Sequence, residues 1–444
     1  MKIHFIGIGG IGVSSLAFYF LNRGDSITGS DLKESDITRS LEKFGAKIII
    51  GNHSPKNITK EVDLVIHTPA IKEDNPEIKK AKKNNIRTES YPEALGRLTK
   101  DYFTIAVSGT HGKSTTTAML SLILIEAGLD PTVIIGTKLK EFGNLNFRPG
   151  KSKYLLIEAD EYKRSFLNYN PKLIVVTNIE EDHLDYYKDR NEIIKSFKAF
   201  FSRLDKGGKI IANYDDPGVV DALKRTKGVI YYDQSDSIAK EIRKILKVPG
   251  EHNVLNALAA YNAANLLGIS KTKTLSALSK FKGSWRRFEV HKSGYKGITL
   301  ISDYAHHPTE VEKTLKAIRD RYPKKRIISF FQPHQYERTK HFFKEFVKVF
   351  AEAPVDKVIF LEIYKVTGRE GRVVCDKINS KKMAEAVGKE SVYKKELSDA
   401  NLYLKRILKK RDVLIFMGAG DINNLFISTK KYLLDKKNKE KDNQ

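Results

Sequence analysis

The chain has 444 residues, of which 41% are hydrophobic and 30% charged, and its formal net charge at pH 7 is +25. This length is too great for one ordinary domain, and the composition excludes a disordered or fibrous protein. No apolar stretch is long enough to span a bilayer, and no signal-peptide pattern opens the chain, so we expect no membrane insertion. The single cysteine, Cys375, excludes an intramolecular disulfide framework and is typical of a reducing compartment, which predicts a cytoplasmic protein.

The positive charge has two interpretations. A nucleic-acid-binding protein would carry its basic side chains in a stripe interleaved with aromatic residues. Here they are spread widely, with short clusters such as Lys79–Lys83 and Lys409–Arg411. We therefore predict no nucleic-acid partner and interpret the charge as lysine on solvated faces, which also suits an anionic small substrate.

The N-terminal part of the chain, residues 1–98, alternates short apolar segments with amphipathic ones. This alternation predicts a Rossmann-like domain with a parallel, doubly wound sheet. The expected strands are Ile3–Gly7, Ser26–Gly29 and Leu64–Thr68.

A glycine motif follows the first of these strands. Gly7, Gly9 and Gly12 form the pattern GxGxxG, and Asp31 stands at the end of the second strand. Glycines permit a tight turn there, and the amides that begin the following helix face an anion. The motif alone leaves three interpretations open: an NAD site, a site for another phosphate-bearing ligand such as a nucleotide sugar, and a structural turn.

The second block, residues 99–284, is expected to be a central ATP-binding domain of the P-loop type. Its predicted elements are strands Phe103–Val107, Tyr154–Ile157 and Leu173–Thr177 and helices Thr115–Ala127 and Val254–Leu267. The loop Gly109-Thr110-His111-Gly112-Lys113-Ser114 joins the first strand to the first helix. Backbone amides in such a loop bind phosphates, the lysine offsets their charge, and the serine hydroxyl can bind Mg²⁺.

Acidic residues follow the other two strands of this block. Since parallel strands end at the same edge of a sheet, they are expected near the glycine-flanked loop, where carboxylate and imidazole could hold magnesium. Taken one at a time, several of them are better interpreted as solvated acids in a loop: Asp160, Glu161, Glu180 and Asp182.

The third block, residues 285–444, repeats the strand–helix alternation and predicts a second Rossmann-like domain. Its expected strands are Thr299–Ser302, Arg326–Phe331, Lys357–Glu362 and Val413–Met417. The charged segment from about Lys430 is expected to be frayed.

A series of strings resembles the Mur ligase family of ATP-dependent, amide-forming enzymes. They are, in the family's order, GTHGKSTTTAM (109–119), EADEYKRSF (158–166), VVTNIEEDHLDYY (175–187), GEHNVLNALAA (250–260), WRRFE (285–289), DYAHHPTE (303–310), FQPHQYERT (331–339) and MGAGD (417–421). The similarity extends from Ile3 to about Phe426. The opening GIGGIG and the string FQPHQYERT are similar to the branch that adds L-alanine.

The resemblance implies roles for individual residues. The UDP-sugar would be bound by Gly7, Gly9, Gly10, Gly12 and Asp31. ATP would be bound by Gly109, Thr110, His111, Gly112, Lys113, Ser114, Thr115, Asn253, Asn256 and Arg287. Magnesium would be held by Ser114, Glu158 and His183. The amino acid would lie near Tyr304, His306 and Arg338. The catalytic residues would be Lys113, His183, Arg287 and Asp303.

The activity implied by the resemblance uses ATP and Mg²⁺ as cofactors and joins L-alanine to UDP-N-acetylmuramic acid in peptidoglycan synthesis. The γ-phosphoryl group first moves to the sugar's carboxylate, and the amine then attacks the acyl phosphate. Three domains that close together would exclude water from this intermediate. We expect a monomer or homodimer.

Three positions need comment. Tyr162 resembles a relative that adds a murein tripeptide, and Gln335 stands where the L-alanine-adding branch has arginine, so a tripeptide-adding ligase is the alternative. Lys198 lies near a lysine that is carbamylated in several Mur ligases, and we expect an ordinary surface lysine. Two alternatives come from other functional classes. An NAD-dependent oxidoreductase is supported by the glycine motif alone, and a nucleic-acid-binding NTPase is supported by the positive charge and the phosphate loop.

Overall fold

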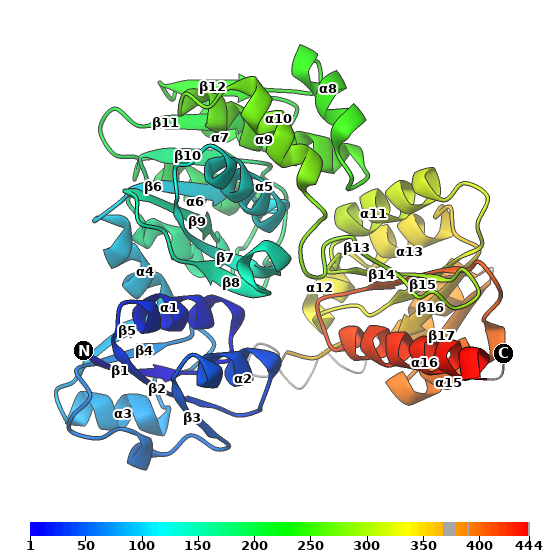
Figure 1. The fold of residues 1–444 in the computed structure, drawn as a ribbon, viewed down its shortest axis with the longest axis horizontal. Helices are drawn as coiled ribbons and strands as arrows, with labels where there is room; N and C mark the ends of the chain where they lie inside the picture. Colours follow the sequence, from blue (N-terminus) through cyan, green and yellow to red (C-terminus); the bar gives the residue numbers. More distant parts are fainter. Residues whose placement is uncertain (367–377, 389, 443–444) are drawn as a thin grey trace. The chain divides into compact units, whose positions relative to one another are not determined.

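The computed structural model describes the whole chain except residues 367–377, 389 and 443–444, so Cys375 lies outside the described residues. Three sheets follow one another along the sequence (Figure 1), in agreement with the three predicted α/β blocks. The described chain forms two compact units. One holds the N-terminal and central sheets; the other holds the C-terminal sheet together with Glu181–Asp189 and Leu246–Asn253.

The N-terminal sheet is parallel, with the strand order β3-β2-β1-β4-β5. Its elements are β1 (Lys2–Ile6), α1 (Ile11–Asn22), β2 (Ser26–Asp31), α2 (Asp36–Lys43), β3 (Lys47–Ile50), the 3₁₀ turn η1 (Pro55–Asn57), β4 (Leu64–His67), α3 (Pro76–Lys83), β5 (Arg87–Ser90) and α4 (Tyr91–Thr99). The three expected strands are confirmed. The other two, β3 and β5, are four-residue edge strands without the buried apolar run on which the prediction depended.

A buried carboxylate lies inside this sheet's core. The side chain of Glu77 accepts hydrogen bonds from donors on β1, β2 and the segment around η1: Ser30 Oγ (2.7 Å), Asn57 Nδ2 (2.6 Å), the Ser54 amide (3.2 Å), and ring nitrogens of His4 (3.3 Å) and His53 (3.4 Å). Burial alone would raise the pKa of Glu77, but the hydrogen bonds outweigh it and lower the pKa to about 2. The ionised carboxylate therefore links α3 to β1 and β2.

The central sheet has the order β12-β11-β10-β6-β9-β7-β8 and is parallel except for β8, which pairs antiparallel with β7. Its elements are β6 (Phe103–Ser108), α5 (Lys113–Glu126), β7 (Thr132–Leu139), η2 (Lys140–Phe142), β8 (Leu145–Arg148), β9 (Tyr154–Ala159), η3 (Tyr162–Asn168), β10 (Leu173–Val176), α6 (Arg190–Phe201), β11 (Lys209–Asn213), α7 (Pro217–Leu223), β12 (Val229–Tyr232), α8 (Ser237–Ile245), α9 (Glu251–Leu266) and α10 (Lys271–Lys280). The neighbours β10, β6 and β9 all end at one edge, which gathers the loops that follow them.

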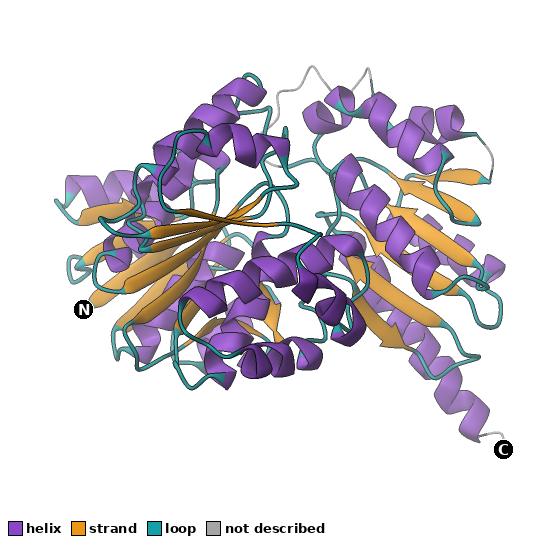
Figure 2. Cartoon of the chain, turned by 90° about the horizontal axis from the view of Figure 1, so that it is seen from above, coloured by secondary structure: helices purple, strands orange, loops and turns teal. Residues whose placement is uncertain are grey.

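The C-terminal sheet has the order β13-β14-β18-β15-β16-β17, with only β13 antiparallel among its described strands. Its elements are β13 (Glu289–Lys292), β14 (Thr299–Asp303), α11 (Pro308–Arg321), β15 (Ile327–Phe331), α12 (Tyr336–His341), α13 (Phe343–Ala351), β16 (Lys357–Leu361), α14 (Ser380–Val387), β17 (Ser391–Lys394), α15 (Leu397–Ile407), β18 (Val413–Met417) and α16 (Ile422–Asp442). Helices cover both faces (Figure 2), because alternate strand residues such as Leu300 and Ile301 belong to separate cores on opposite sides.

The charged C-terminal segment corrects one expectation. Helix α16 continues to Asp442, so the chain from Lys430 is not frayed. Leu433 is fully buried and packs with Leu425 and Phe426 in the core on that face, which explains why the helix persists. No helix among the described residues is long and apolar enough to cross a membrane.

Candidate functional site

The glycine turn after β1 is held by the end of β2. The Gly9 amide donates to Asp31 Oδ2 (2.9 Å), and the Gly7 amide donates to the Ser30 carbonyl (2.8 Å). A side chain on Gly12 would lie 3.2 Å from the ring of Tyr91, which explains the glycine there. Gly10 is the residue that precedes α1, so the motif lies at a helix N-terminus as predicted.

The loop between β6 and α5 is closed by residues that follow β10. The Thr177 hydroxyl donates to the His111 carbonyl (2.6 Å), while the side chain of Asn178 accepts from the His111 amide (2.9 Å) and donates to its carbonyl (3.0 Å). Gly109 and Gly112 both have left-handed backbone angles (φ 131° and 84°). A Cβ on Gly112 would collide with Asn256 Oδ1, which places Asn256 beside the loop, as the sequence implied.

Lys113 begins α5 and folds back over its own loop. Its Nζ donates to the Gly109 carbonyl (2.6 Å) and to Glu161 Oε2 (2.7 Å). Burial opposes the charge on Lys113, but the surrounding carboxylates, with Glu161 foremost, outweigh it and raise its pKa. The expectation of a solvated acid is wrong for Glu161, whose side chain is 2% exposed, and holds for Asp160, which is 55% exposed. The sequence did not indicate that Asp160 and Glu161, which directly follow β9, would form ion pairs with Lys113.

Ser114 and Glu158 are the two expected metal ligands that contact each other. Ser114 Oγ donates to Glu158 Oε2 (3.0 Å), and Glu158 Oε1 accepts from the Gly136 amide (2.6 Å). Two oxygen ligands that face each other at the end of a phosphate loop fit Mg²⁺, which prefers oxygen. Thr115 is buried in the next position of α5.

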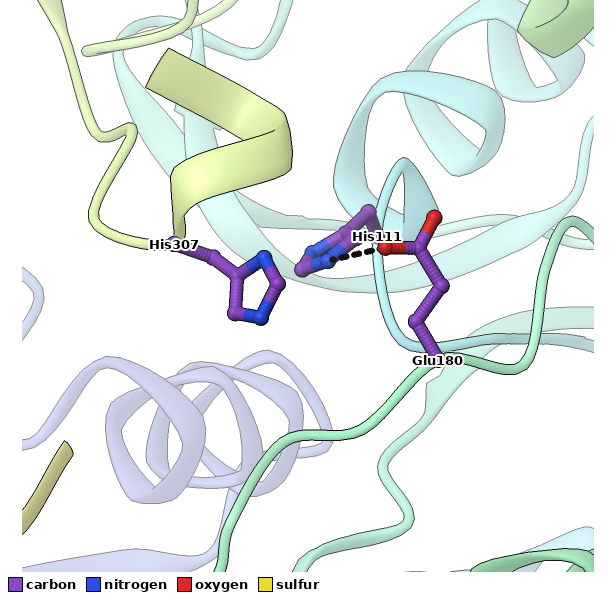
Figure 3. A group of neighbouring side chains, drawn as sticks. All are labelled: His111, Glu180 and His307. Carbon is purple, nitrogen blue, oxygen red and sulfur yellow. Dashed lines mark ion pairs between the residues drawn. The ribbon is translucent and has the colours of Figure 1, made fainter. Parts of the chain in front are cut away.

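The loop residue His111 also has an acidic partner, Glu180. The ring of His111 faces the carboxylate of Glu180 (Figure 3), at 3.7 Å between Nε2 and Oε2. Glu180 is half-buried, and its amide donates to the Thr110 hydroxyl (2.9 Å). His307, also drawn in Figure 3, belongs to the second compact unit, where its side chain caps helix α11 and accepts from the Thr309 amide (3.3 Å).

Two predicted ligands of the central block belong to the second compact unit. Asn253 donates to the Pro249 carbonyl (2.6 Å) at the start of α9. His183 lies in Glu181–Asp189 and has a left-handed backbone (φ 55°). The structure therefore brings Lys113, Ser114, Glu158 and Asn256 together in one unit, and groups Asn253 and His183 with the C-terminal sheet.

Within the second unit, Asp303 ends β14. Its carboxylate accepts from the Phe288 amide (2.7 Å) and the Ala305 amide (2.8 Å). Burial, partly offset by Arg287 and these amides, raises the pKa of Asp303 to about 6. Arg287 lies over the ring of Tyr304, with 4.8 Å from Cζ to the ring centroid. The predicted residues Arg287, Asp303 and Tyr304 are thus neighbours.

His306 joins this group. Its Nδ1 lies 3.0 Å from the Tyr304 carbonyl and 3.2 Å from Glu310 Oε2, and its ring meets that of His334 at 5.9 Å between centroids. Burial lowers the pKa of His306 to about 3, so the ring is neutral at pH 7 and carries no charge for a carboxylate ligand. Glu310 and His334 were not singled out by the sequence.

Arg338 lies in the first turn of α12, and Asp182 binds it. Its Nε and Nη2 both donate to Asp182 Oδ1 (3.0 and 2.9 Å), and its Nη1 lies 3.2 Å from His334 Nδ1. Both partners of the pair are buried, so the expectation of a solvated acid is also wrong for Asp182. Arg338 holds the pKa of Asp182 well below its ordinary value against the effect of burial.

The remaining positions raised by the sequence lie as follows. Gln335 is buried with a left-handed backbone (φ 70°) directly before α12. Tyr162 is buried at the start of η3, and Lys198 is exposed on α6. The exposure of Lys198 agrees with an ordinary surface lysine.

Comparison with known families matches nearly the whole chain. The model of the "Mur ligase family, catalytic domain" matches residues 2–103, that of the "Mur ligase middle domain" matches residues 107–264, and that of the "Mur ligase, glutamate ligase domain" matches residues 286–420.

Individual relatives agree. A UDP-N-acetylmuramate–L-alanine ligase from Clostridium kluyveri is 42% identical, over 95% of this chain and 96% of its own. Among solved structures, a UDP-N-acetylmuramate–alanine ligase from Thermotoga maritima superposes with a TM-score of 0.78 at 27% identity, covering 99% of this chain and 100% of that one. A murein peptide ligase from Psychrobacter arcticus gives a TM-score of 0.74 at 25% identity, covering 98% and 99%.

Proposed function

Because this chain belongs to the Mur ligase family, we propose that it uses ATP to join L-alanine to UDP-N-acetylmuramic acid in peptidoglycan synthesis. The observation that carries the proposal is the 42% identity, over nearly full length, to a ligase of that name. The alternative, a tripeptide-adding ligase, is supported more weakly, by the likeness at 25% identity to a structure named a murein peptide ligase.

ATP is assigned to the loop between β6 and α5. Its backbone amides would bind the phosphates, and the ammonium of Lys113 would balance the negative charge that spreads over the γ-phosphoryl group during transfer. A carboxylate oxygen of the sugar attacks the γ-phosphorus and ADP leaves, which forms an acyl phosphate. The amino nitrogen of L-alanine then attacks the carbonyl carbon, loses a proton and expels phosphate.

Magnesium is assigned to Ser114 and Glu158; the other ligand implied by the resemblance, His183, belongs to the second compact unit. A bound Mg²⁺ would neutralise phosphate charge and help to orient the phosphoryl oxygens. The support is the short distance between the Ser114 hydroxyl and the Glu158 carboxylate beside Lys113.

The UDP-sugar is assigned to the glycine turn after β1 with Asp31, and the amino acid to the group formed by Tyr304, His306 and Arg338. Since burial keeps His306 neutral, Arg338 supplies the positive charge for the acceptor carboxylate. These assignments correspond to three domains at residues 1–98, 99–284 and 285–444. We place the reaction in the cytoplasm, where ATP is made, and propose a monomer or homodimer.

The decisive experiment measures phosphate release from ATP with UDP-N-acetylmuramic acid and a panel of acceptors: L-alanine, glycine, L-serine and the L-Ala-γ-D-Glu-diaminopimelate tripeptide. We expect L-alanine to be preferred, with glycine and L-serine weaker. Faster turnover of the tripeptide would favour the alternative, and release that ignores the UDP-sugar would refute both.

Gln335 offers a second test of the acceptor. An arginine there would add a second positive charge near the acceptor carboxylate, so Gln335→Arg should lower the KM for L-alanine about threefold and leave the KM for ATP unchanged. An unchanged KM for L-alanine would count against a role of this position in acceptor binding.

A further inference from the structure

The pair formed by Asp182 and Arg338 has an uneven geometry. A carboxylate usually receives a guanidinium with one oxygen for each of two N–H groups. Here Nε and Nη2 of Arg338 converge on the single oxygen Oδ1 of Asp182, which also accepts from the His183 amide (2.7 Å). Asp182 therefore holds one edge of the guanidinium and leaves the other edge, at Nη1, directed toward His334.

The pair is also well shielded from water. The side chains of Arg338 and Asp182 are 6% and 5% exposed. An arginine side chain has several rotatable bonds, and ordering it for a ligand costs conformational entropy unless a partner has already fixed it. The Nη1 edge contacts His334. The ring of His334 in turn contacts that of His306, one of the residues assigned to the acceptor.

We propose that Asp182 is a positioning residue for acceptor binding: it fixes the guanidinium of Arg338 so that Nη1 presents its donors to the carboxylate of the incoming amino acid. This inference rests on the proposed function, in which Arg338 binds that carboxylate. It gives a role in substrate recognition to an acid that precedes the expected metal ligand His183.

The test is Asp182→Asn, which keeps the size of the side chain and removes its charge. We expect the KM for the acceptor to rise about tenfold or more, with kcat reduced less than threefold and the KM values for ATP and the UDP-sugar within twofold of wild type. A merely structural role would lower the melting temperature or kcat without this selective change in KM.

A matched control comes from another ion pair of the same unit. Arg326 Nη1 lies 3.2 Å from Asp412 Oδ2, and Asp412 is buried, but neither residue belongs to the acceptor group. Asp412→Asn should destabilise the fold and leave the acceptor KM unchanged. If both variants raise the acceptor KM equally, or neither does, the proposal is overturned.

A second comparison keeps the test valid if Asp182→Asn folds poorly. Arg338→Gln is compared with the double variant Asp182→Asn/Arg338→Gln, in which no member of the pair is charged. Since Asp182 is proposed to act through Arg338, the two should have the same acceptor KM; a further rise in the double variant overturns the proposal. Should wild type prefer the tripeptide, that substrate serves as the acceptor, and only the assignment of L-alanine fails.

Discussion

Two cations of this chain, the partly buried Lys113 and the buried Arg338, each contact a carboxylate that follows a strand of the central sheet. The two pairs differ in the donors that they leave available for a ligand. The ammonium of Lys113 donates to Glu161 and to two carbonyls of its own loop. The guanidinium of Arg338 gives one edge to Asp182 and directs the other elsewhere.

The difference follows from the shape of the charged groups. An ammonium has three donors around one atom, and all three are used in the structure, so Lys113 must release at least one partner before it can bind a phosphate. A guanidinium has five donors on a rigid plane and can bind a ligand while it remains paired. We therefore expect Lys113 to exchange partners during the reaction and Arg338 to keep its own.

The largest effect is expected for Lys113, the cation that exchanges its hydrogen-bond partners. Lys113→Ala removes the charge that offsets the γ-phosphoryl group and should lower kcat/KM for ATP by about a thousandfold or more. Binding of the UDP-sugar, followed by calorimetry, should remain nearly intact because the glycine turn belongs to another sheet. Equal loss of both would show that the assignment of ligands to domains is wrong.

A pH titration tests the difference between two buried acids of the second unit, Asp303 and Asp182. Asp303 has no cation in direct contact among the described residues, and burial raises its pKa to about 6, whereas the pKa of Asp182 is held low by Arg338. A carboxyl whose pKa rises on folding favours the folded state below its ordinary pKa, and this contribution is lost as the pH rises through 6. The stability of wild type relative to Asp303→Asn should therefore fall by about 1.4 kcal/mol between pH 5 and pH 8. Urea unfolding at both pH values measures it; a constant difference would contradict the raised pKa.

A smaller effect tests the exchange itself. Glu161→Gln removes the negative charge from one of the three partners of Lys113 and should make the exchange easier, so the KM for ATP should fall about threefold while the melting temperature also falls. Glu161→Asp serves as the control because it keeps the charge. A rise in the KM for ATP would show instead that Glu161 takes part in binding the nucleotide or its metal.

The smallest effect is expected at Lys198. Because its side chain is exposed on α6, Lys198→Ala should leave kcat within about twofold of wild type, and added bicarbonate should not change activity at low pH. Bicarbonate rescue of wild type that disappears in the variant would establish carbamylation.

The sequence predicted the architecture well wherever a strand was apolar and central. Val413–Met417 matches β18 residue for residue, and Phe103–Val107 lies within β6. Edge strands were missed because their residues need not be apolar: β5 reads Arg-Thr-Glu-Ser. The phosphate loop could be recognised because its glycines, lysine and serine are adjacent in the chain.

The ion pairs could not be recognised in this way. Glu161 lies 48 residues from Lys113, and Asp182 lies 156 residues from Arg338. In a sequence such acids look like any others in a polar loop, and only the folded sheet brings them against a cation. Sequence patterns thus predicted the cations at the expected binding sites, but identifying the carboxylates that bind these cations required the structure.

The buried carboxylate of Glu77 has a consequence for the acid tolerance of the protein. With its pKa lowered from an ordinary 4.5 to about 2, Glu77 stabilises the folded state above pH 4.5, and that contribution disappears as the pH falls through 2. Unfolding in this pH range takes up a proton. Acid should therefore break the hydrogen bonds that join α3 to β1 and β2 before it unfolds parts of the sheets that contain no ionised side chain. Amide hydrogen exchange at pH 3 and pH 6, compared with Glu77→Gln, would locate this opening. The N-terminal sheet, which carries the glycine turn, should then be the first part of the molecule to unfold in acid. Uridine-nucleotide binding should be lost while the central sheet is still folded.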